Sequence, residues 1–252
     1  MNAIPKRWII DLGNSRLKCA SLDAQGHRGE VVAISHGQPH PTIALLEHIG
    51  ADCIGAQVWL ASVASVERTK AVIDALQLAG MAVFRVQTQP RCGKLRIAYP
   101  EPSRLGVDRF LALLAACERN DGPWLIVSAG SALTVDLLGA DGVHVGGLIS
   151  PMPSDMRAAL AQRVAQLDLP EGHARDFAND SADAIASGAQ AAALGLVERC
   201  LRKAHERLGS SPTLLITGGG AEFLAALDHP GTVILPSLVL DGLACFVQDV
   251  ER

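Results

Sequence analysis

The sequence predicts an α/β protein made of two related halves, and three matched pairs of residues support this prediction. In each half an apolar strand meets a glycine turn, returns as a second strand, and passes through another glycine turn into a third. The pairs are Trp8 and Trp124, 116 residues apart, Gly13 and Gly130, 117 apart, and Gly26 and Gly142, 116 apart. Repetition at this scale predicts one supersecondary unit per copy. Two unrelated α/β domains that share a common hairpin are the alternative.

The composition is that of a folded globular protein. Of the 252 residues, 49% are hydrophobic and 19% are charged, which argues against a disordered chain. Aromatic residues make up only 4%, so the core must consist mainly of Leu, Ile, Val and Ala. The net charge is −4 and no run of Lys or Arg occurs, so we expect no nucleic acid partner.

Cysteine usage and hydropathy indicate a reducing compartment. No apolar run reaches the length of a membrane span, and residues 1–8 have no apolar signal core, so we expect a cytoplasmic protein without a membrane partner. Several cysteines lie in apolar segments, where a reduced thiol serves as a small hydrophobe. The six cysteines are far apart and form no CxxC pair: Cys19, Cys53, Cys92, Cys117, Cys200 and Cys245.

The first half alternates between strands and helices. We expect a domain over residues 1–118. Its predicted strands are 7–11, 15–22, 30–35, 58–63 and 81–86, and its predicted helices are 41–50, 67–80, with Gly80 at the C-cap, and 110–120. Residues 87–105 contain three prolines and read as one long loop, which is typical of a functional segment.

The second half, residues 119–252, starts the pattern again. Three strand-like pieces between residues 124 and 150 are followed by helices predicted at 152–166 and 182–207. A strand at 213–217, the turn Gly218-Gly219-Gly220, a helix, a strand at 232–235 and a last helix complete the chain.

The glycine turns are candidate phosphate-binding loops. A hairpin turn with Asp-x-Gly-Asn offers backbone N–H groups to an anion, and glycine lets the backbone approach closely. Lys18 on the returning strand could reach the same phosphate, and Gly218-Gly219-Gly220 could pass close to a nucleotide. Taken singly, each turn could be an ordinary hairpin. Neither GxxxxGK[ST] nor GxGxxG occurs in the sequence, which argues against a P-loop or Rossmann nucleotide site. Two RNase H-like halves that close on a nucleotide are instead the architecture of the actin-like and sugar-kinase superfamily, which is therefore the predicted fold.

A second group of polar residues opens an apolar helix. Tyr99, the only tyrosine, lies in the Pro-rich loop, and Gly106-Val107-Asp108-Arg109 follows it. Asp108 could be the N-cap of the helix, accepting from its first N–H groups. It could also accept a proton from an attacking hydroxyl while Arg109 holds anionic oxygens. The two interpretations are compatible.

An ordered set of motifs resembles one family. The chain closely resembles type III pantothenate kinase, a family that includes proteins named Bvg accessory factor, from about residue 8 to 244. GxDR alone is a weak signal, whereas the ordered set is specific. The motifs are DLGNSRLK (11–18), GVDR (106–109), SAGSALTVD (128–136), GGLISP (146–151), SADAIASG (181–188) and ITGGG (216–220).

The resemblance implies ATP-dependent phosphorylation of pantothenate, the first step of coenzyme A biosynthesis, by a homodimer. Asp108 matches the family's catalytic base, and Ser181 matches a threonine that contacts pantothenate across the dimer interface. The residues that match the ATP site are Asp11, Leu12, Gly13, Asn14, Ser15, Arg16, Leu17, Lys18 and Ser131, and those that match the substrate site are Tyr99, Gly106, Val107, Asp108 and Arg109.

One position departs from the family pattern. The resemblance implies Mg²⁺ with the ATP and a monovalent cation, K⁺ or NH₄⁺. Asp11, at the end of its strand, could hold the Mg²⁺ through water. The family binds the monovalent cation with an Asp where this chain has Ser128, a neutral and poorer ligand. Asp136 is retained, but its position in the sequence does not show that it substitutes, so dependence on potassium stays open.

Two other functions compete with the kinase. One is a regulatory member of the same family with weak or absent kinase activity, which only Ser128 favours. The other is a phosphotransferase or phosphohydrolase of the exopolyphosphatase type, which would require a basic channel that the composition does not suggest. His36 and His40 have helical spacing, but Gly37, Pro39 and Pro41 place them in a loop, which argues against a zinc site.

Overall fold

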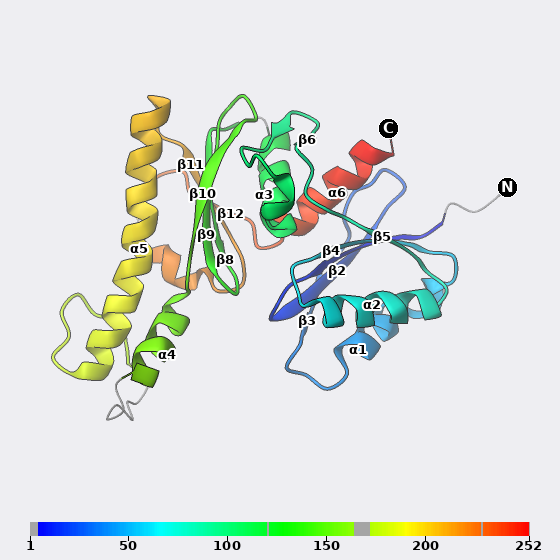
Figure 1. The fold of residues 1–252 in the computed structure, drawn as a ribbon, viewed down its shortest axis with the longest axis horizontal. Helices are drawn as coiled ribbons and strands as arrows, with labels where there is room; N and C mark the ends of the chain where they lie inside the picture. The colour runs from blue at the N-terminus through cyan, green and yellow to red at the C-terminus, as the bar shows by residue number, and fades with distance from the viewer. Residues whose placement is uncertain (1–4, 120, 164–171, 228, 252) are drawn as a thin grey trace. The chain divides into compact units, whose positions relative to one another are not determined.

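A computed structural model describes residues 5–119, 121–163, 172–227 and 229–251. The chain divides into two units (Figure 1). Unit 1 comprises residues 1–121, 140–144 and 237–252, and unit 2 comprises residues 122–139 and 145–236. The last helix and a short segment of the second half of the sequence therefore belong to unit 1.

Unit 1 contains a five-stranded mixed sheet in the order β3-β2-β1-β4-β5. β1 pairs antiparallel with β2 and parallel with β4. The elements are β1 (Arg7–Leu12), β2 (Arg16–Leu22), β3 (Val32–Ser35), α1 (Pro41–Ile49), η1 (Gly50–Cys53), β4 (Gln57–Ser62), α2 (Val66–Leu78), β5 (Ala82–Arg85), β6 (Arg91–Cys92), β7 (Leu95–Arg96), η2 (Pro102–Arg104), α3 (Val107–Glu118) and α6 (Leu238–Val250).

Unit 2 contains a second five-stranded sheet in the corresponding order, β10-β9-β8-β11-β12. β8 pairs antiparallel with β9 and parallel with β11, as β1 does with β2 and β4. The elements are β8 (Trp124–Ala129), β9 (Leu133–Leu138), β10 (His144–Ser150), α4 (Pro153–Arg163), α5 (Ser181–Leu208), β11 (Thr213–Thr217), η3 (Ala221–Ala226) and β12 (Val233–Ile234). The matching topology confirms the predicted duplication and its mixed sheets.

The strand registers explain the offsets between the halves. Leu12 pairs with Leu17 across the first turn, whereas Ala129 pairs with Leu133 across the second, so the second turn is one residue shorter. The offset is therefore 117 residues along β1 and β8 and falls to 116 beyond the turn. The match of Trp8 with Trp124 is wrong by one residue, because β8 begins at Trp124 where β1 begins at Arg7.

In unit 1, helices cover both faces of the sheet (Figure 1). Alternate residues of β1 and β2 pack with α1 and α2 in one core cluster, which includes Ile10, Leu12, Leu17, Cys19, Leu45 and Leu76. Successive strand residues point to opposite faces, so Asp11 and Lys18 lie on the other face, toward α3 and α6. In unit 2, α5 packs through Ala193, Val197 and Cys200 against Val127 and Val135.

Helices α3 and α6 cross at very close range. Gly242 lies at the crossing, where a Cβ atom would come within 1.9 Å of the Leu111 carbonyl oxygen. Phe110 and Phe246 make an edge contact nearby, with ring centroids 6.2 Å apart. The glycine therefore sets the separation of the two helices that cover the Asp11 face of the sheet.

Several predicted elements differ from the structure in their bounds. The loop over 87–105 contains the short hairpin β6–β7 and the 3₁₀ turn η2, elements too short for periodicity to reveal. The helix predicted from residue 110 begins at Val107, Gly80 lies one residue beyond the C-cap Ala79, and the helix predicted after Gly220 is the 3₁₀ helix η3. Residue 120 and residues 164–166, at the ends of two predicted helices, lie outside the described residues.

All six cysteine thiols are free. Within the described ranges no helix combines the length and the apolar character needed to span a bilayer.

We predict that Gly242→Ala lowers the free energy of unfolding by about 1–3 kcal/mol, the usual cost of overpacking, because the new methyl group would collide with backbone rather than a movable side chain. Gly195→Ala in α5 is the matched control, since no atom outside its own helix lies within 4 Å of that Cβ position. It should stabilise by about 0.5–1 kcal/mol. Urea unfolding measures both, and equal effects would contradict the close crossing.

Candidate active site

The first group of site residues lies at the carboxyl end of β1. Asp11 is directly opposite Lys18 on β2, and both side chains lie on the sheet face that α3 and α6 cover. Lys18 Nζ and the Asp11 carboxylate are thus cross-strand neighbours of opposite charge. The turn that joins the strands is closed by the Gly13 N–H, which donates to the Arg16 carbonyl oxygen at 3.1 Å.

The charges around Asp11 are coupled. Burial, reinforced by the negative charge of Asp108, raises the pKa of Asp11 to about 7, while Lys18 acts in the opposite direction. Burial lowers the pKa of Lys18, and the Asp11 carboxylate counteracts that shift. Asp108, 97 positions further along the sequence, is therefore close enough to act on Asp11. A site with two carboxylates and one ammonium group is poised for proton transfer and cation binding.

Asp108 lies in the first turn of α3 and is not its N-cap. Gly106 is the N-cap residue, and Asp108 Oδ1 accepts from the Arg109 N–H at 2.8 Å. The carboxylate therefore still satisfies a backbone donor at the positive end of the helix dipole. A Cβ atom on residue 106 would lie 2.5 Å from Asp108 Oδ1, so glycine leaves the space that the carboxylate occupies.

Arg109, Tyr99 and His144 form a stack beside this helix start. Arg109 is 6% exposed, and its Nη1 donates to the Tyr99 hydroxyl at 3.2 Å. The guanidinium carbon lies 5.8 Å from the centre of the Tyr99 ring. The fully buried His144 ring lies nearly parallel to Tyr99, with centroids 6.0 Å apart. The structure thus brings Tyr99 and Arg109 together.

The second glycine turn and the third lie together in unit 2. Gly130 N–H donates to the Ala132 carbonyl, which leaves Ser131 exposed at the tip. Gly220 N–H donates to Ala129 O at 3.0 Å. Gly218 has φ +96°, and a Cβ there would lie 2.3 Å from Ala129 O, so only glycine allows this approach.

Ser128 and Asp136 share a face of the unit 2 sheet. Ser128 pairs with Thr134 on β9, and Asp136 lies two positions further along the same strand, opposite Ile126. Asp136 is 3% exposed. Within the described ranges no group of three or more His, Cys, Asp or Glu side chains is arranged to hold a metal ion.

Ser181 is the first residue of α5 and is exposed. The preceding segment folds back onto the helix through Asp183, whose carboxylate accepts from the His173 N–H at 2.8 Å and from Arg175 Nε at 2.6 Å. These hydrogen bonds lower the pKa of Asp183. The segment before α5 is therefore held against the first turn of the helix, next to Ser181.

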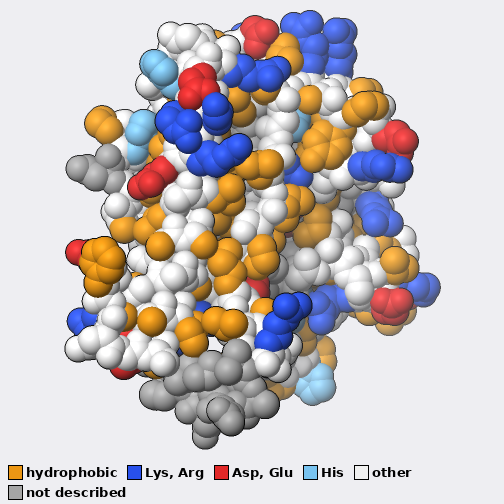
Figure 2. All heavy atoms as spheres, turned by 60° about the vertical axis from the view of Figure 1, so that its left-hand side comes forward, with side chains coloured by type: hydrophobic (Ala, Val, Ile, Leu, Met, Phe, Trp, Pro, Cys, Tyr) orange, Lys and Arg blue, Asp and Glu red, His pale blue; other side chains and the backbone are white. Residues whose placement is uncertain are grey.

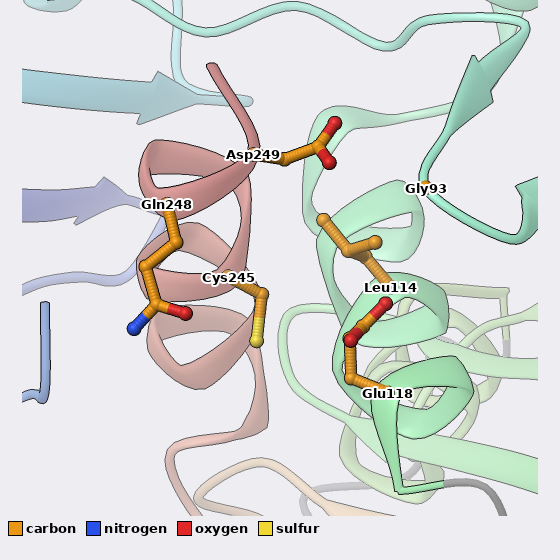
Figure 3. Close-up of a pocket in the computed structure, with 6 residues that line it drawn as sticks. All are labelled: Gly93, Leu114, Glu118, Cys245, Gln248 and Asp249. Carbon is orange, nitrogen blue, oxygen red and sulfur yellow. The ribbon is translucent and has the colours of Figure 1, made fainter. Parts of the chain in front are cut away.

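A small pocket between the C-terminal parts of α3 and α6 is separate from these groups (Figure 3). Its lining residues are Gly93, Leu114, Glu118, Cys245, Gln248 and Asp249. Burial, together with the nearby Glu118 carboxylate, raises the pKa of Cys245 to about 11. The thiol is therefore protonated at neutral pH and is a poor nucleophile, and we assign this pocket no catalytic role.

Comparison with known proteins identifies the family. The model of the family type III pantothenate kinase matches residues 8–203. A type III pantothenate kinase from Stenotrophomonas maltophilia (strain K279a) is 48% identical over 244 residues, covering 94% of this chain and 95% of that protein. The chain belongs to the type III pantothenate kinase family.

Solved structures of low sequence identity share the fold. A protein from Campylobacter jejuni described as a Baf family transcriptional activator has a TM-score of 0.62 at 17% identity, with 97% of this chain and 98% of that one covered. MreB 5 of Spiroplasma citri has a TM-score of 0.51 at 13% identity, with 99% and 98% covered. They confirm the predicted actin-like fold, and at such identities they show the fold alone, so they give the regulatory alternative no support.

Three residues close to the site were not predicted. His36 and Arg68 hydrogen-bond backbone carbonyls of the turn after β1, and His144 stacks on Tyr99. Backbone recognition leaves no side-chain motif in the sequence. His144 lies in the second half of the sequence, but residues 140–144 belong to unit 1. Its contact with Tyr99 therefore follows from the fold and not from a local sequence pattern.

We predict that Asp108→Asn lowers the pKa of Asp11 from about 7, because the substitution removes a negative charge that raises it. Carboxyl ¹³C NMR in buffer without divalent cations measures the shift.

The folded state also keeps a proton on Asp11 between pH 4 and 7 that the unfolded chain has lost, so the free energy of unfolding should fall as pH rises through this window. Asp11→Asn should lack this component. An unchanged Asp11 pKa in Asp108→Asn would contradict the proximity of the carboxylates.

Proposed function

We propose that Asp108 is the general base of a pantothenate kinase. The enzyme phosphorylates pantothenate with ATP, the first step of coenzyme A biosynthesis. The primary hydroxyl oxygen attacks the γ-phosphorus, the bond to the bridging oxygen of ADP breaks, and the hydroxyl proton passes to the Asp108 carboxylate. The observation that supports this role is the position of Asp108 in the first turn of α3, where its Oδ1 accepts from the Arg109 N–H and its charge acts on Asp11 of β1.

We assign the ATP phosphates to the turn over residues 11–18, with Ser131 as a further contact. Lys18, held beside Asp11 on β2, supplies a positive charge to the phosphates. The close approach of Gly218 to the second turn leaves a backbone surface suited to the nucleoside. The fold likeness to MreB 5 of Spiroplasma citri, which was solved bound to AMPPNP, is consistent with a nucleotide site in this fold.

We assign pantothenate to the residues around the start of α3. Arg109 would bind the pantothenate carboxylate, since guanidinium and carboxylate form strong charge-assisted hydrogen bonds. The hydrogen bond from Arg109 to Tyr99 holds both side chains in one arrangement. Gly106 and Val107 line the same segment, and Ser181 of the partner subunit would complete the site in a dimer.

Mg²⁺ fits the residues beside the phosphate turn. The ion binds through one or two carboxylates and the substrate phosphates, and it keeps several waters. Asp11, whose pKa is raised to about 7, would be stabilised in its ionised form by a nearby divalent cation. Asp11 would hold the ion through water, and the ion would neutralise charge on the phosphates.

We propose that a monovalent cation binds weakly or not at all at position 128. Ser128 offers a neutral oxygen where the family has a carboxylate. Asp136 is buried on β9, two positions beyond Thr134, the residue that pairs with Ser128.

We predict that turnover changes less than about twofold when sodium replaces potassium or ammonium, and that Ser128→Asp introduces potassium activation. A coupled assay in each salt measures this, and strong potassium dependence of the unaltered enzyme would contradict it.

We propose that the enzyme is a cytoplasmic homodimer. The large apolar side chains that unit 2 exposes include Leu148, Ile149, Leu160 and Phe177, of which Phe177 is 96% exposed. Figure 2 shows apolar side chains spread over the surface that comes forward when the left-hand side of Figure 1 turns toward the viewer. A dimer that buried these side chains together would remove apolar surface from water. Sedimentation analysis that found only monomers would contradict the dimer.

We predict that Asp108→Asn lowers kcat by about 10²–10⁴, the usual effect of removing a general base. The amide still accepts the hydrogen bond from the Arg109 N–H, so the fold should survive and circular dichroism should be unchanged. Glu101→Gln, in an exposed ion pair with Arg104 on the preceding loop, is a matched control and should retain activity. Turnover of Asp108→Asn at the unaltered rate would show that another group is the base.

A further inference from the structure

The turn after β1 has all four of its carbonyl oxygens hydrogen-bonded. Gly13 O accepts from His36 Nε2 at 2.9 Å, and Asn14 O accepts from Arg68 Nη1 at 3.0 Å. Ser15 O accepts from the His36 backbone N–H at 3.1 Å, and Arg16 O accepts from Gly13 N–H at 3.1 Å. Three of the four donors come from His36 and Arg68, which lie outside the turn.

The two donor residues are fixed by different elements. His36 directly follows β3, and Ser35 pairs with Arg16 on β2, so strand pairing brings His36 to the turn. Arg68 lies in the first turn of α2, where its N–H donates to the side chain of the N-cap residue Ser65 at 3.2 Å. The connection before α2 is itself held against the end of β1, directly before the turn, since Val63 N–H donates to Leu12 O.

These contacts matter because an anion-binding turn must present N–H groups to the phosphates and direct its carbonyl oxygens elsewhere. A carbonyl oxygen that rotated toward ATP would repel it. Donors that hold each carbonyl fix the peptide planes before the nucleotide arrives, so binding needs less reorganisation. Because a carbonyl can only accept, His36 carries a proton on Nε2 in this contact.

We propose that His36 and Arg68 are positioning residues that hold the phosphate turn in its ATP-binding conformation. They act through the backbone of the turn, and they set the affinity for ATP without contacting pantothenate. The inference rests on the proposed assignment of the ATP phosphates to residues 11–18, so its test must separate the two.

The first test uses His36. His36→Asn shortens the side chain so that the donor no longer reaches Gly13 O, and KM for ATP should rise about tenfold, the effect of one lost hydrogen bond of ordinary strength. KM for pantothenate should stay within twofold. His36→Gln keeps an amide donor near the position of Nε2 and should restore most of the ATP affinity. His40→Asn, on the same loop and exposed, is the matched control and should change neither constant.

The second test uses Arg68. Arg68→Met removes the donor to Asn14 O and should also raise KM for ATP about tenfold, whereas Arg68→Lys should restore part of the affinity. Lys70→Met on the same helix is the control, because the Lys70 side chain is exposed and pairs with Asp74. Direct titration with a non-hydrolysable ATP analogue gives the affinities independently of turnover.

Lys18→Met separates the inference from the site assignment on which it rests. If Lys18→Met weakens ATP binding and the His36 and Arg68 variants do not, the positioning role is wrong and the assignment stands. If all three variants bind ATP as the unaltered enzyme does, the assignment fails and the positioning role fails with it. Melting temperatures are measured in parallel, and equal rises in KM for ATP and for pantothenate would show a general structural effect and overturn the proposal.

Discussion

The site depends on the placement of two carboxylates and one ammonium group on the buried face of the first sheet. Asp11 and Lys18 are fixed by strand pairing, and Asp108 is fixed by the first turn of α3. Burial alone would favour a protonated Asp11, and the charge of Asp108 adds to that tendency. Asp11 therefore retains its proton up to a higher pH than a free carboxyl group, and a cation bound nearby would favour its ionised form. The same arrangement of charges is suited to phosphoryl transfer, in which a cation neutralises the phosphates.

The remaining architecture keeps α3 in place. α6 lies at the far end of the sequence but belongs to unit 1, where Gly242 lets its backbone approach Leu111 of α3. The helix start is then adjusted by small local features: Gly106 leaves room for the Asp108 carboxylate, and Arg109 is buried with a hydrogen bond to Tyr99. The site residues of unit 1 are therefore supported by contacts between segments more than 100 residues apart.

The elements and motifs of the site could be predicted from local patterns, whereas most of the contacts that support them could not. Apolar runs interrupted by Gly13 and Gly130 predict the hairpins, because alternation and turn chemistry are local. The coupling of Asp11 to Asp108 depends on how α3 packs on the sheet, which local periodicity does not contain. His36 and Arg68 donate to backbone carbonyl oxygens of the turn. Because every residue type has a carbonyl oxygen, the residue types in the turn give no sign of these contacts. The N-cap interpretation of Asp108 was wrong because Gly106 is the N-cap and the helix begins at Val107.

The most direct test of the account is a crystal structure of the enzyme with pantothenate and a non-hydrolysable ATP analogue. We expect the primary hydroxyl of pantothenate to lie within about 2.6–3.2 Å of an Asp108 carboxylate oxygen, the reach of a general base, and on the line between that carboxylate and the γ-phosphate. A hydroxyl well beyond hydrogen-bonding reach of Asp108, with both ligands bound, would contradict the central claim.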